Sequence, residues 1–182
     1  MKNAWLVALF IAAPATATTL ISDPGRTRFE TLAARADAAV HLEVVKQTYR
    51  LVGGRIVTDS QCRVLGAGFG ASEGDTLTVT TLGGHWGAYA QKVDGIESFV
   101  PGDRLAVLLS PPGYMAGGRT IVGFSYGIFR TLSDGASARL FAVDRPLPAR
   151  VSRDDVSVDP GDDAPASVDE FFSRAVAAKA RR

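Results

Sequence analysis

The amino-acid sequence predicts a mainly β protein: a small antiparallel β-barrel of OB-like (oligonucleotide/oligosaccharide-binding-like) shape, with an N-terminal and a C-terminal helix. Between residues 40 and 143, short segments of alternating apolar residues are separated by glycine-containing turns, which is typical of antiparallel strands. Apolar residues at helical spacing occur near each end of the chain. The 182 residues include one cysteine, so a single domain must be stabilised by burial without an internal disulfide.

The first 17 residues have the pattern of a secretory signal peptide. Lys2 precedes an apolar run over residues 4–13, and the small residues Ala15 and Ala17 follow. The run is shorter than the roughly 20 apolar residues that span a bilayer. We therefore expect cleavage after Ala17 and a periplasmic or secreted mature protein without a membrane anchor. The alternative interpretation is a buried N-terminal helix.

The charge balance bears on the kind of partner. The chain has 20 Lys and Arg against 19 Asp and Glu, and removal of Lys2 with the signal peptide makes the numbers equal. Proteins that bind nucleic acid usually carry a basic excess on one face. The arginines are scattered and do not alternate with aromatic residues. We therefore predict no nucleic-acid partner.

The predicted barrel domain, residues 18–145, begins with a helix. Thr27 and Glu30 fit a capping box, in which the two side chains satisfy backbone donors at a helix start. The apolar residues that follow have helical spacing: Phe29, Leu32, Ala33, Ala36 and Val40. This pattern predicts a helix over residues 28–39.

Two long strands follow in the prediction. The first runs from Val40 to Leu51, and Gly53-Gly54 marks the turn to a second strand from Arg55 to Leu65. Alternate residues of the second strand share one face, which we expect to be the core face. They are Ile56, Thr58, Ser60, Cys62 and Val64. We expect the Cys62 thiol to be buried and unreactive.

The rest of the barrel is predicted as four further strands and their connections. Residues 66–70, rich in glycine, are expected to form a loop before a strand over residues 76–82. Residues 104–109 are nearly all apolar, as in a strand buried on both faces. Residues 119–130 alternate with Val122, Phe124, Tyr126 and Ile128 on one face, and residues 139–143 add a short edge strand.

After the barrel, residues 146–166 are predicted as an acidic, proline-rich linker and residues 167–182 as a C-terminal helical region. Ser167 and Glu170 form a second capping-box match, which opens a helix through Lys179. Phe171 and Val176 are the residues that would dock this helix on the barrel. The sequence leaves open whether it docks or is only tethered.

We predict no catalytic residue, metal site or cofactor. The run Gly66-x-Gly68-x-Gly70 is not followed by a helix, which a phosphate-binding loop requires. Cys62 lies in the middle of a strand, where a nucleophilic thiolate paired with His85 is disfavoured. His41 and His85 are the only histidines, and no further ligand stands at zinc-site spacing.

The segment from Gly83 to Asp103 (GGHWGAYAQKVDGIESFVPGD) is the candidate functional region. Its glycines indicate a tight backbone path. In one interpretation it is a corner of the barrel, with Trp86 and Phe99 as plugs of the core. In the other it is a surface loop that contacts a ligand or protein, since Trp and Tyr dominate such contacts. The candidate binding residues are His85, Trp86, Tyr89 and Gln91.

The spacing of residues in this segment supports a resemblance. The runs Gly83-Gly84-x-x-Gly87, Gln91-x-Val93-x-Gly95 and Phe99-x-x-Gly102-Asp103 resemble a group of uncharacterised bacterial exported proteins. The likeness covers about residues 27–131 and the C-terminal helix, and it departs at Ala88 and Glu97, where the group has glycine and proline. The resemblance implies a domain type and no particular reaction.

Three hypotheses about function remain from the sequence, and one of them is a structural accessory whose C-terminal helix docks on a partner. The first is an exported, non-enzymatic binding or interaction module whose partner, an extracytoplasmic protein or a small ligand, is unknown. The alternative is an extracytoplasmic hydrolase or metal-dependent enzyme that uses His85 with Asp94 or Asp103. His85 beside two carboxylates in one cleft would favour the enzyme, whereas an exposed Trp86 without titratable neighbours would favour binding.

Overall fold

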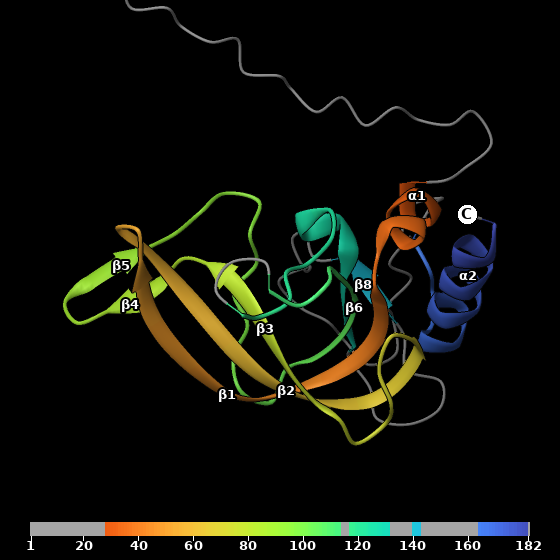
Figure 1. The fold of residues 1–182 in the computed structure, drawn as a ribbon, viewed down its shortest axis with the longest axis horizontal. Helices are drawn as coiled ribbons and strands as arrows, with labels where there is room; N and C mark the ends of the chain where they lie inside the picture. The colour runs from red at the N-terminus through yellow and green to blue at the C-terminus, as the bar shows by residue number, and fades with distance from the viewer. Residues whose placement is uncertain (1–27, 114–116, 132–139, 143–163, 182) are drawn as a thin grey trace, which may run out of the picture.

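The computed structural model describes residues 28–113, 117–131, 140–142 and 164–181. Within them the protein is mainly β, with one helix near each end, as predicted (Figure 1). Along the chain the elements are α1 (Arg28–Arg35), β1 (Ala38–Val52), β2 (Arg55–Phe69), β3 (Thr76–Leu82), β4 (Gly84–Trp86), β5 (Tyr89–Gln91), β6 (Arg104–Leu109), η1 (Phe124–Gly127), β7 (Ile128–Thr131), β8 (Leu140–Ala142) and α2 (Val168–Ala180). The predicted signal peptide and most of the predicted linker lie outside the described residues.

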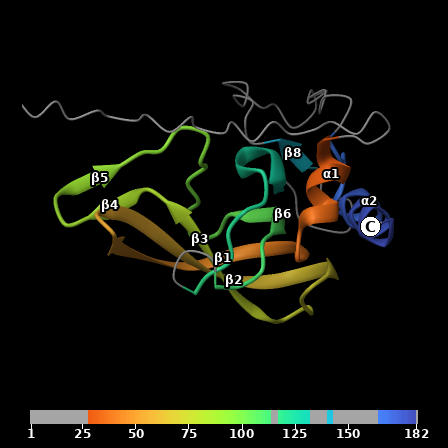
Figure 2. The same ribbon diagram turned by 45° about the horizontal axis from the view of Figure 1, so that its top comes forward.

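The strands form one large antiparallel sheet and one small one. The large sheet has the order β3-β2-β1-β6-β7-β8, and β4 pairs only with β5 in the small sheet. β1 and β2 form a long hairpin that pairs from Ala39 opposite Phe69 to Val52 opposite Arg55. The hairpin reaches from the helices at one end of the molecule to the β4–β5 hairpin at the other, as Figures 1 and 2 both show.

The ladders of the described strands do not close into a barrel. Outside the ladders, an isolated parallel bridge joins Val79 of β3 to Arg119, and an antiparallel bridge joins Leu109 of β6 to Ile121. The prediction of a mainly antiparallel β fold is therefore confirmed. The closed barrel that the sequence predicted is not formed by the ladders of the described strands.

The prediction of a continuous strand over residues 119–130 is wrong. After Ile121 the chain forms the short 3₁₀ helix η1 and then β7. Gly123 and Phe124 both have positive φ angles, 79° and 55°, and two such residues in succession interrupt the extended backbone of the predicted strand. As a result Phe124 and Ile128 differ in burial: Phe124 is exposed and Ile128 is buried.

Two clusters of buried side chains lie on opposite faces of β6, as predicted for a strand buried on both sides. Leu105, Val107 and Leu109 belong to a cluster inside the curved sheet, together with residues of β1, β2 and β3. Ala106 and Leu108 belong to a second cluster, which α1 and α2 cover. Alternation along the strand therefore distributes successive side chains between two cores.

β2 extends through the segment that the sequence predicted as a glycine-rich loop. Residues 66–69 are strand, and their glycines lie under α2. A Cβ atom at Gly68 would lie 3.2 Å from Cδ1 of Phe172 and 3.4 Å from Cγ2 of Val176. Glycine here allows the helix to approach the strand closely. Close approach of another element is, besides turns and bulges, a reason for glycine in strands.

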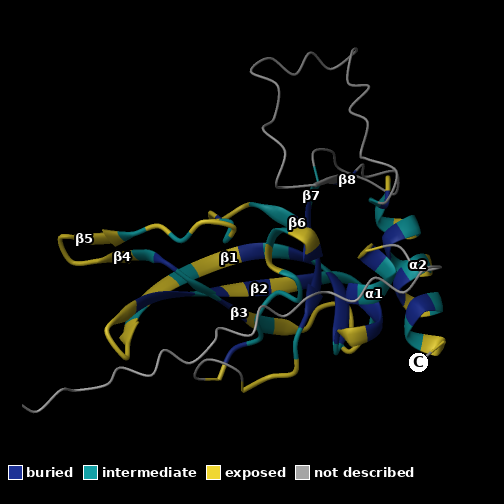
Figure 3. Cartoon of the chain, turned by 90° about the horizontal axis from the view of Figure 1, so that it is seen from above, coloured by how far each residue is buried: buried dark blue, intermediate teal, exposed yellow. Residues whose placement is uncertain are grey.

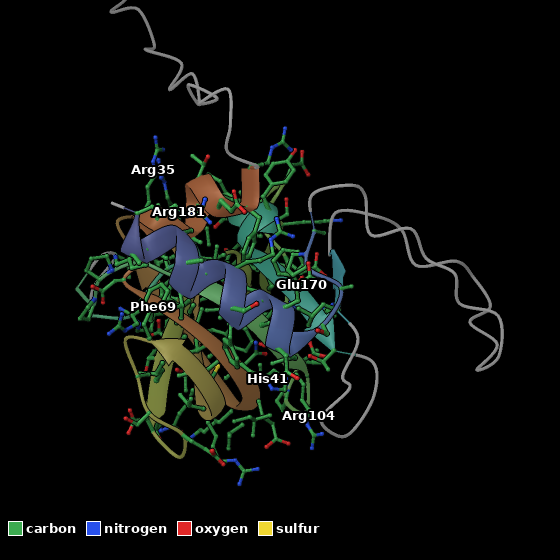
Figure 4. The ribbon with its side chains drawn as sticks, turned by 90° about the vertical axis from the view of Figure 1, so that its right-hand side faces the viewer. Arg35, His41, Phe69, Arg104, Glu170 and Arg181 are labelled. Atoms are coloured by element: carbon green, nitrogen blue, oxygen red, sulfur yellow. The ribbon has the colours of Figure 1, made fainter. Side chains whose placement is uncertain are left out.

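α2 docks on the domain and completes its second core. The Ser167 hydroxyl accepts a hydrogen bond from the Glu170 amide at 3.2 Å, as the capping box predicts. Phe171 is 0% exposed, and near the other end of the helix the Lys179 ammonium donates to the carbonyl of Ala36 at 2.5 Å. Figure 4 looks onto this end, with α2 in front of the strands and Phe69 beside it. The helix is thus an integral part of the fold.

Cys62 is buried on β2, on the same face as Ile56 and Val64, as predicted. Burial raises the pKa of its thiol from 9.0 to about 12. We therefore expect slow labelling of the native protein by a thiol reagent and fast labelling in denaturant. Cys62→Ser should destabilise the fold by roughly 1–3 kcal/mol, because it places a hydroxyl in an apolar site. Fast labelling of the native protein would contradict the burial.

The same thiol gives a pH dependence with a defined sign. Because the folded pKa lies above the unfolded one, the thiol's contribution to stability is complete below pH 9 and is lost as pH rises from 9 to about 12. The slope from one such group is about 1.4 kcal/mol per pH unit. Urea unfolding of wild type and Cys62→Ala across this range measures it, and equal slopes for the two proteins would contradict it.

Candidate functional site

The candidate residues lie on a hairpin at the end of the molecule opposite to α1 and α2. β4 and β5 pair with Trp86 opposite Tyr89 and Gly84 opposite Gln91, and Gly87-Ala88 form the two-residue turn. Figure 3 shows this hairpin as an exposed extension beyond the large sheet. It lies beside the tip of the β1–β2 hairpin (Figure 1).

The base of the hairpin is fixed to β2 by hydrogen bonds. The Gly83 amide donates to the Ile56 carbonyl at 2.8 Å, and the Thr58 hydroxyl donates to the Gly83 carbonyl at 2.7 Å. From β5, the side-chain oxygen of Gln91 accepts from the Ile56 amide at 2.8 Å. Both strands of the small hairpin are therefore anchored to one segment of β2.

Gly84 allows β4 to lie close to the long hairpin. Its φ angle is 119°, and a Cβ atom there would lie 2.3 Å from Oγ1 of Thr58 and 2.8 Å from Cδ1 of Tyr49. Any other residue would be strained and would also push the hairpin away from Tyr49. Close approach therefore accounts for Gly84 at the base of the hairpin, whereas Gly87, Gly95 and Gly102 have open space at the Cβ position and are distinguished by their positive φ angles.

The outer part of the hairpin exposes aromatic side chains. Trp86 is 46% exposed and Tyr89 is 75% exposed, although they lie directly opposite each other. His85 is also exposed, and its ring meets the ring of Tyr49 edge-on at a centroid distance of 6.1 Å. Leu51 is exposed two residues beyond Tyr49 on β1, so the two share a face of the strand. Alternation along β4 places His85, beside Tyr49, on one face of the hairpin and Trp86, with Tyr89, on the other. We call the exposed residues of the two faces the hairpin surface: Tyr49, Leu51, His85, Trp86 and Tyr89.

The structure separates the predicted residues by role. His85, Trp86 and Tyr89 belong to the hairpin surface, whereas the Gln91 side chain is used to hold β2. Of the two proposed core plugs, Phe99 is buried, but Trp86 is not, so that part of the corner interpretation is wrong. Tyr49 was missed, although the predicted strand ending at Leu51 already placed it near the turn.

Of the two carboxylates in the enzyme alternative, Asp103 is engaged by other groups. The Asp103 carboxylate accepts from the Val100 amide at 2.9 Å and pairs with Arg130 at 2.9 Å. In the part of the chain that the structure describes, no hydrogen bond or ion pair joins His85 to Asp94 or Asp103. Nor do the described residues include a group of three or more His, Cys, Asp and Glu able to hold a metal ion.

The second histidine lies in the large sheet. His41 is on β1, opposite Gly66, and its Nε2 atom is 3.1 Å from the Thr131 hydroxyl. Burial, and to a lesser degree the charge of Arg104, lowers the pKa of His41 below its ordinary value. It is therefore a partly buried residue whose surroundings favour the neutral imidazole, and its side-chain hydrogen-bond partner is Thr131.

Searches with this chain found no matching family model, curated protein or solved structure. Among the described helices, neither α1 nor α2 has the length and apolar character needed to cross a membrane.

Proposed function

We propose that this protein is an exported, non-enzymatic binding module that contacts a protein partner through the hairpin surface. The observation that carries the proposal is the exposure of Trp86 and Tyr89, which face each other across a hairpin that is anchored to β2. Trp and Tyr provide large contact area at a small cost in conformational entropy, and they dominate the energetics of protein interfaces.

A protein partner fits this surface better than a small ligand does. Small-molecule sites are usually concave and bury most of the ligand. The β4–β5 hairpin instead extends away from the large sheet (Figure 3). Its base is fixed by the contacts of Gly83 and Gln91 with Ile56, so the aromatic side chains are presented by an ordered backbone. A rigid, projecting aromatic surface is the geometry of a protein contact.

The OB-like shape is part of the proposal. In OB folds, five strands form a partly open Greek-key barrel, and ligands often contact the β1–β2 loop. The parallel bridge between Val79 and Arg119 and the antiparallel bridge between Leu109 and Ile121 support this relationship, because they connect β3 to β6 through residues 119–121. The hairpin surface lies next to the β1–β2 turn.

Site-specific crosslinking tests the partner contact. A photoreactive amino acid at position 89, in the organism that makes the protein, should yield one predominant crosslinked protein. The same amino acid at Tyr126, an exposed aromatic position outside the hairpin surface, is the matched control. Trp86→Ala should remove the crosslink and leave the Tm almost unchanged. Equal crosslinking from both positions, or none from position 89, would exclude the contact.

Export is the second element of the proposal, and it rests on the pattern of the first 17 residues. The small side chains of Ala15 and Ala17 are those that signal peptidase requires. The intact mass of the protein from an extracytoplasmic fraction should correspond to a chain that begins at Thr18. A mature protein that keeps residues 1–17 would contradict the export proposal without affecting the crosslinking result.

A further inference from the structure

A small apolar pocket lies at the end of β3, apart from the hairpin surface. It has a volume of about 170 Å³ and lies between β3, residues 96–97 and residues 120–128. Its apolar lining consists of Leu82, Ile96, Ile121, Phe124 and Ile128. An apolar cavity of about 150 Å³ binds a single benzene ring. The pocket therefore has the size for one aromatic ring or a short alkyl chain.

Phe124 occupies an unusual position in this pocket. It lines the pocket, yet it is 65% exposed, and it is the non-glycine residue with a positive φ angle, 55°, in the described chain. Such a conformation is unfavourable for a bulky residue, and conformations of this kind gather at ligand-binding positions. A ligand in the pocket would cover apolar surface of Phe124 that is now exposed to water.

The charge beside the pocket selects the kind of ligand. Glu97 is the charged residue in the lining, and its carboxylate accepts from Arg130 at 3.0 Å. The same guanidinium also pairs with Asp103 at 2.9 Å. One arginine is thus shared between two carboxylates, so the three side chains together keep one negative charge. A ligand that brings a positive charge to Glu97 would neutralise this remaining negative charge.

We propose that the pocket binds a small apolar amine, with its ring or alkyl chain among the isoleucines and Phe124 and its ammonium group at the Glu97 carboxylate. The threonines of the lining, Thr80, Thr81 and Thr120, add hydroxyl groups but no charge. No residue of the hairpin surface lines this pocket, so the inference does not depend on the proposed function.

Methyl NMR of the isoleucine-labelled mature protein tests the site with three matched probes. Benzylamine, benzyl alcohol and phenylacetate present the same ring with a positive, neutral or negative group. Benzylamine should shift the methyl signals of Ile96, Ile121 and Ile128 saturably, with a Kd roughly tenfold lower than that of benzyl alcohol. Phenylacetate should bind weakest. Absence of saturable shifts at these residues, or tighter binding of phenylacetate, would overturn the inference.

Two variants and a control separate the apolar and the charged contributions. Ile96→Trp fills the pocket and should abolish binding of benzylamine, whereas Val100→Trp, at an exposed position nearby in the chain, should not. Glu97→Gln keeps a hydrogen-bond acceptor for Arg130 and should reduce the affinity for benzylamine to that for benzyl alcohol. Unchanged preference for the amine in Glu97→Gln would overturn the role of Glu97. Unfolding midpoints near the wild-type value establish that each variant is folded.

Discussion

Replacing Phe171 by alanine is expected to destabilise the protein by about 3–5 kcal/mol, which is the usual cost of truncating a buried aromatic residue. Phe171 is 0% exposed and forms the centre of an aromatic cluster between α1, α2 and β7. Its ring centroid lies 5.4 Å from that of Phe29, 5.9 Å from that of Phe129 and 5.6 Å from that of Phe172. Each such pair adds stability beyond the area that it buries.

Urea unfolding followed by far-UV circular dichroism measures this loss. Val176→Ala is the control, since Val176 lies on the same helix but is exposed, and it should cost less than about 1 kcal/mol. Removal of residues 167–182 should destabilise at least as strongly as Phe171→Ala. If Phe171→Ala were as mild as the control, α2 would be a tether and the second core would be formed without it.

Local pattern was sufficient for one strand whose residues alternate and for one that is nearly all apolar. Residues 76–82 and 104–109 form strands with the predicted bounds. Residues 66–69 were missed, because glycine in a sequence usually marks a turn. Here a Cβ atom at Gly68 would crowd the ring of Phe172, which is more than one hundred residues away along the chain. The local spacing of residues in the sequence gives no indication of such a long-range contact.

The interruption between Ile121 and Ile128 has a similar origin. The alternation of Val122, Phe124 and Ile128 predicts a strand, and β7 does form where the prediction placed its end. The positive φ angles of Gly123 and Phe124 divert the chain into η1. Phenylalanine rarely adopts this conformation, so residue type gave no indication of it.

The candidate site shows the same division between local and long-range information. Glycine density and aromatic residue types selected the segment that contains Trp86 and Tyr89, but they did not predict the β4–β5 hairpin that this segment forms. The anchoring role of Gln91 depends on the backbone of Ile56, 35 residues earlier, and had no local signal. Trp86 and Phe99 are both aromatic residues of one glycine-rich segment, and only the path of the chain decides which of them enters the core.

Phe99→Ala is expected to cost about 3–5 kcal/mol of unfolding free energy, again as a large buried aromatic truncation. Phe99 packs in the core inside the curved sheet, with Val44, Leu105 and other residues of that cluster. Its carbonyl accepts a hydrogen bond from the Gln47 side chain at 2.9 Å, which holds this part of the loop against β1. The ring therefore has a fixed place, and its removal leaves a cavity that the loop cannot fill.

Trp86→Ala is the matched comparison, because it truncates a larger aromatic side chain in the same segment. Trp86 is 46% exposed, so this change should lower the unfolding free energy by less than about 1 kcal/mol. Urea unfolding of the two variants side by side separates the core residue from the contact residue. Equal destabilisation by both would mean that Trp86 is also part of the core, and the hairpin surface would then lose its central residue. Because Phe99 is buried and Trp86 is exposed, we expect a large loss of unfolding free energy for Phe99→Ala and a small loss for Trp86→Ala.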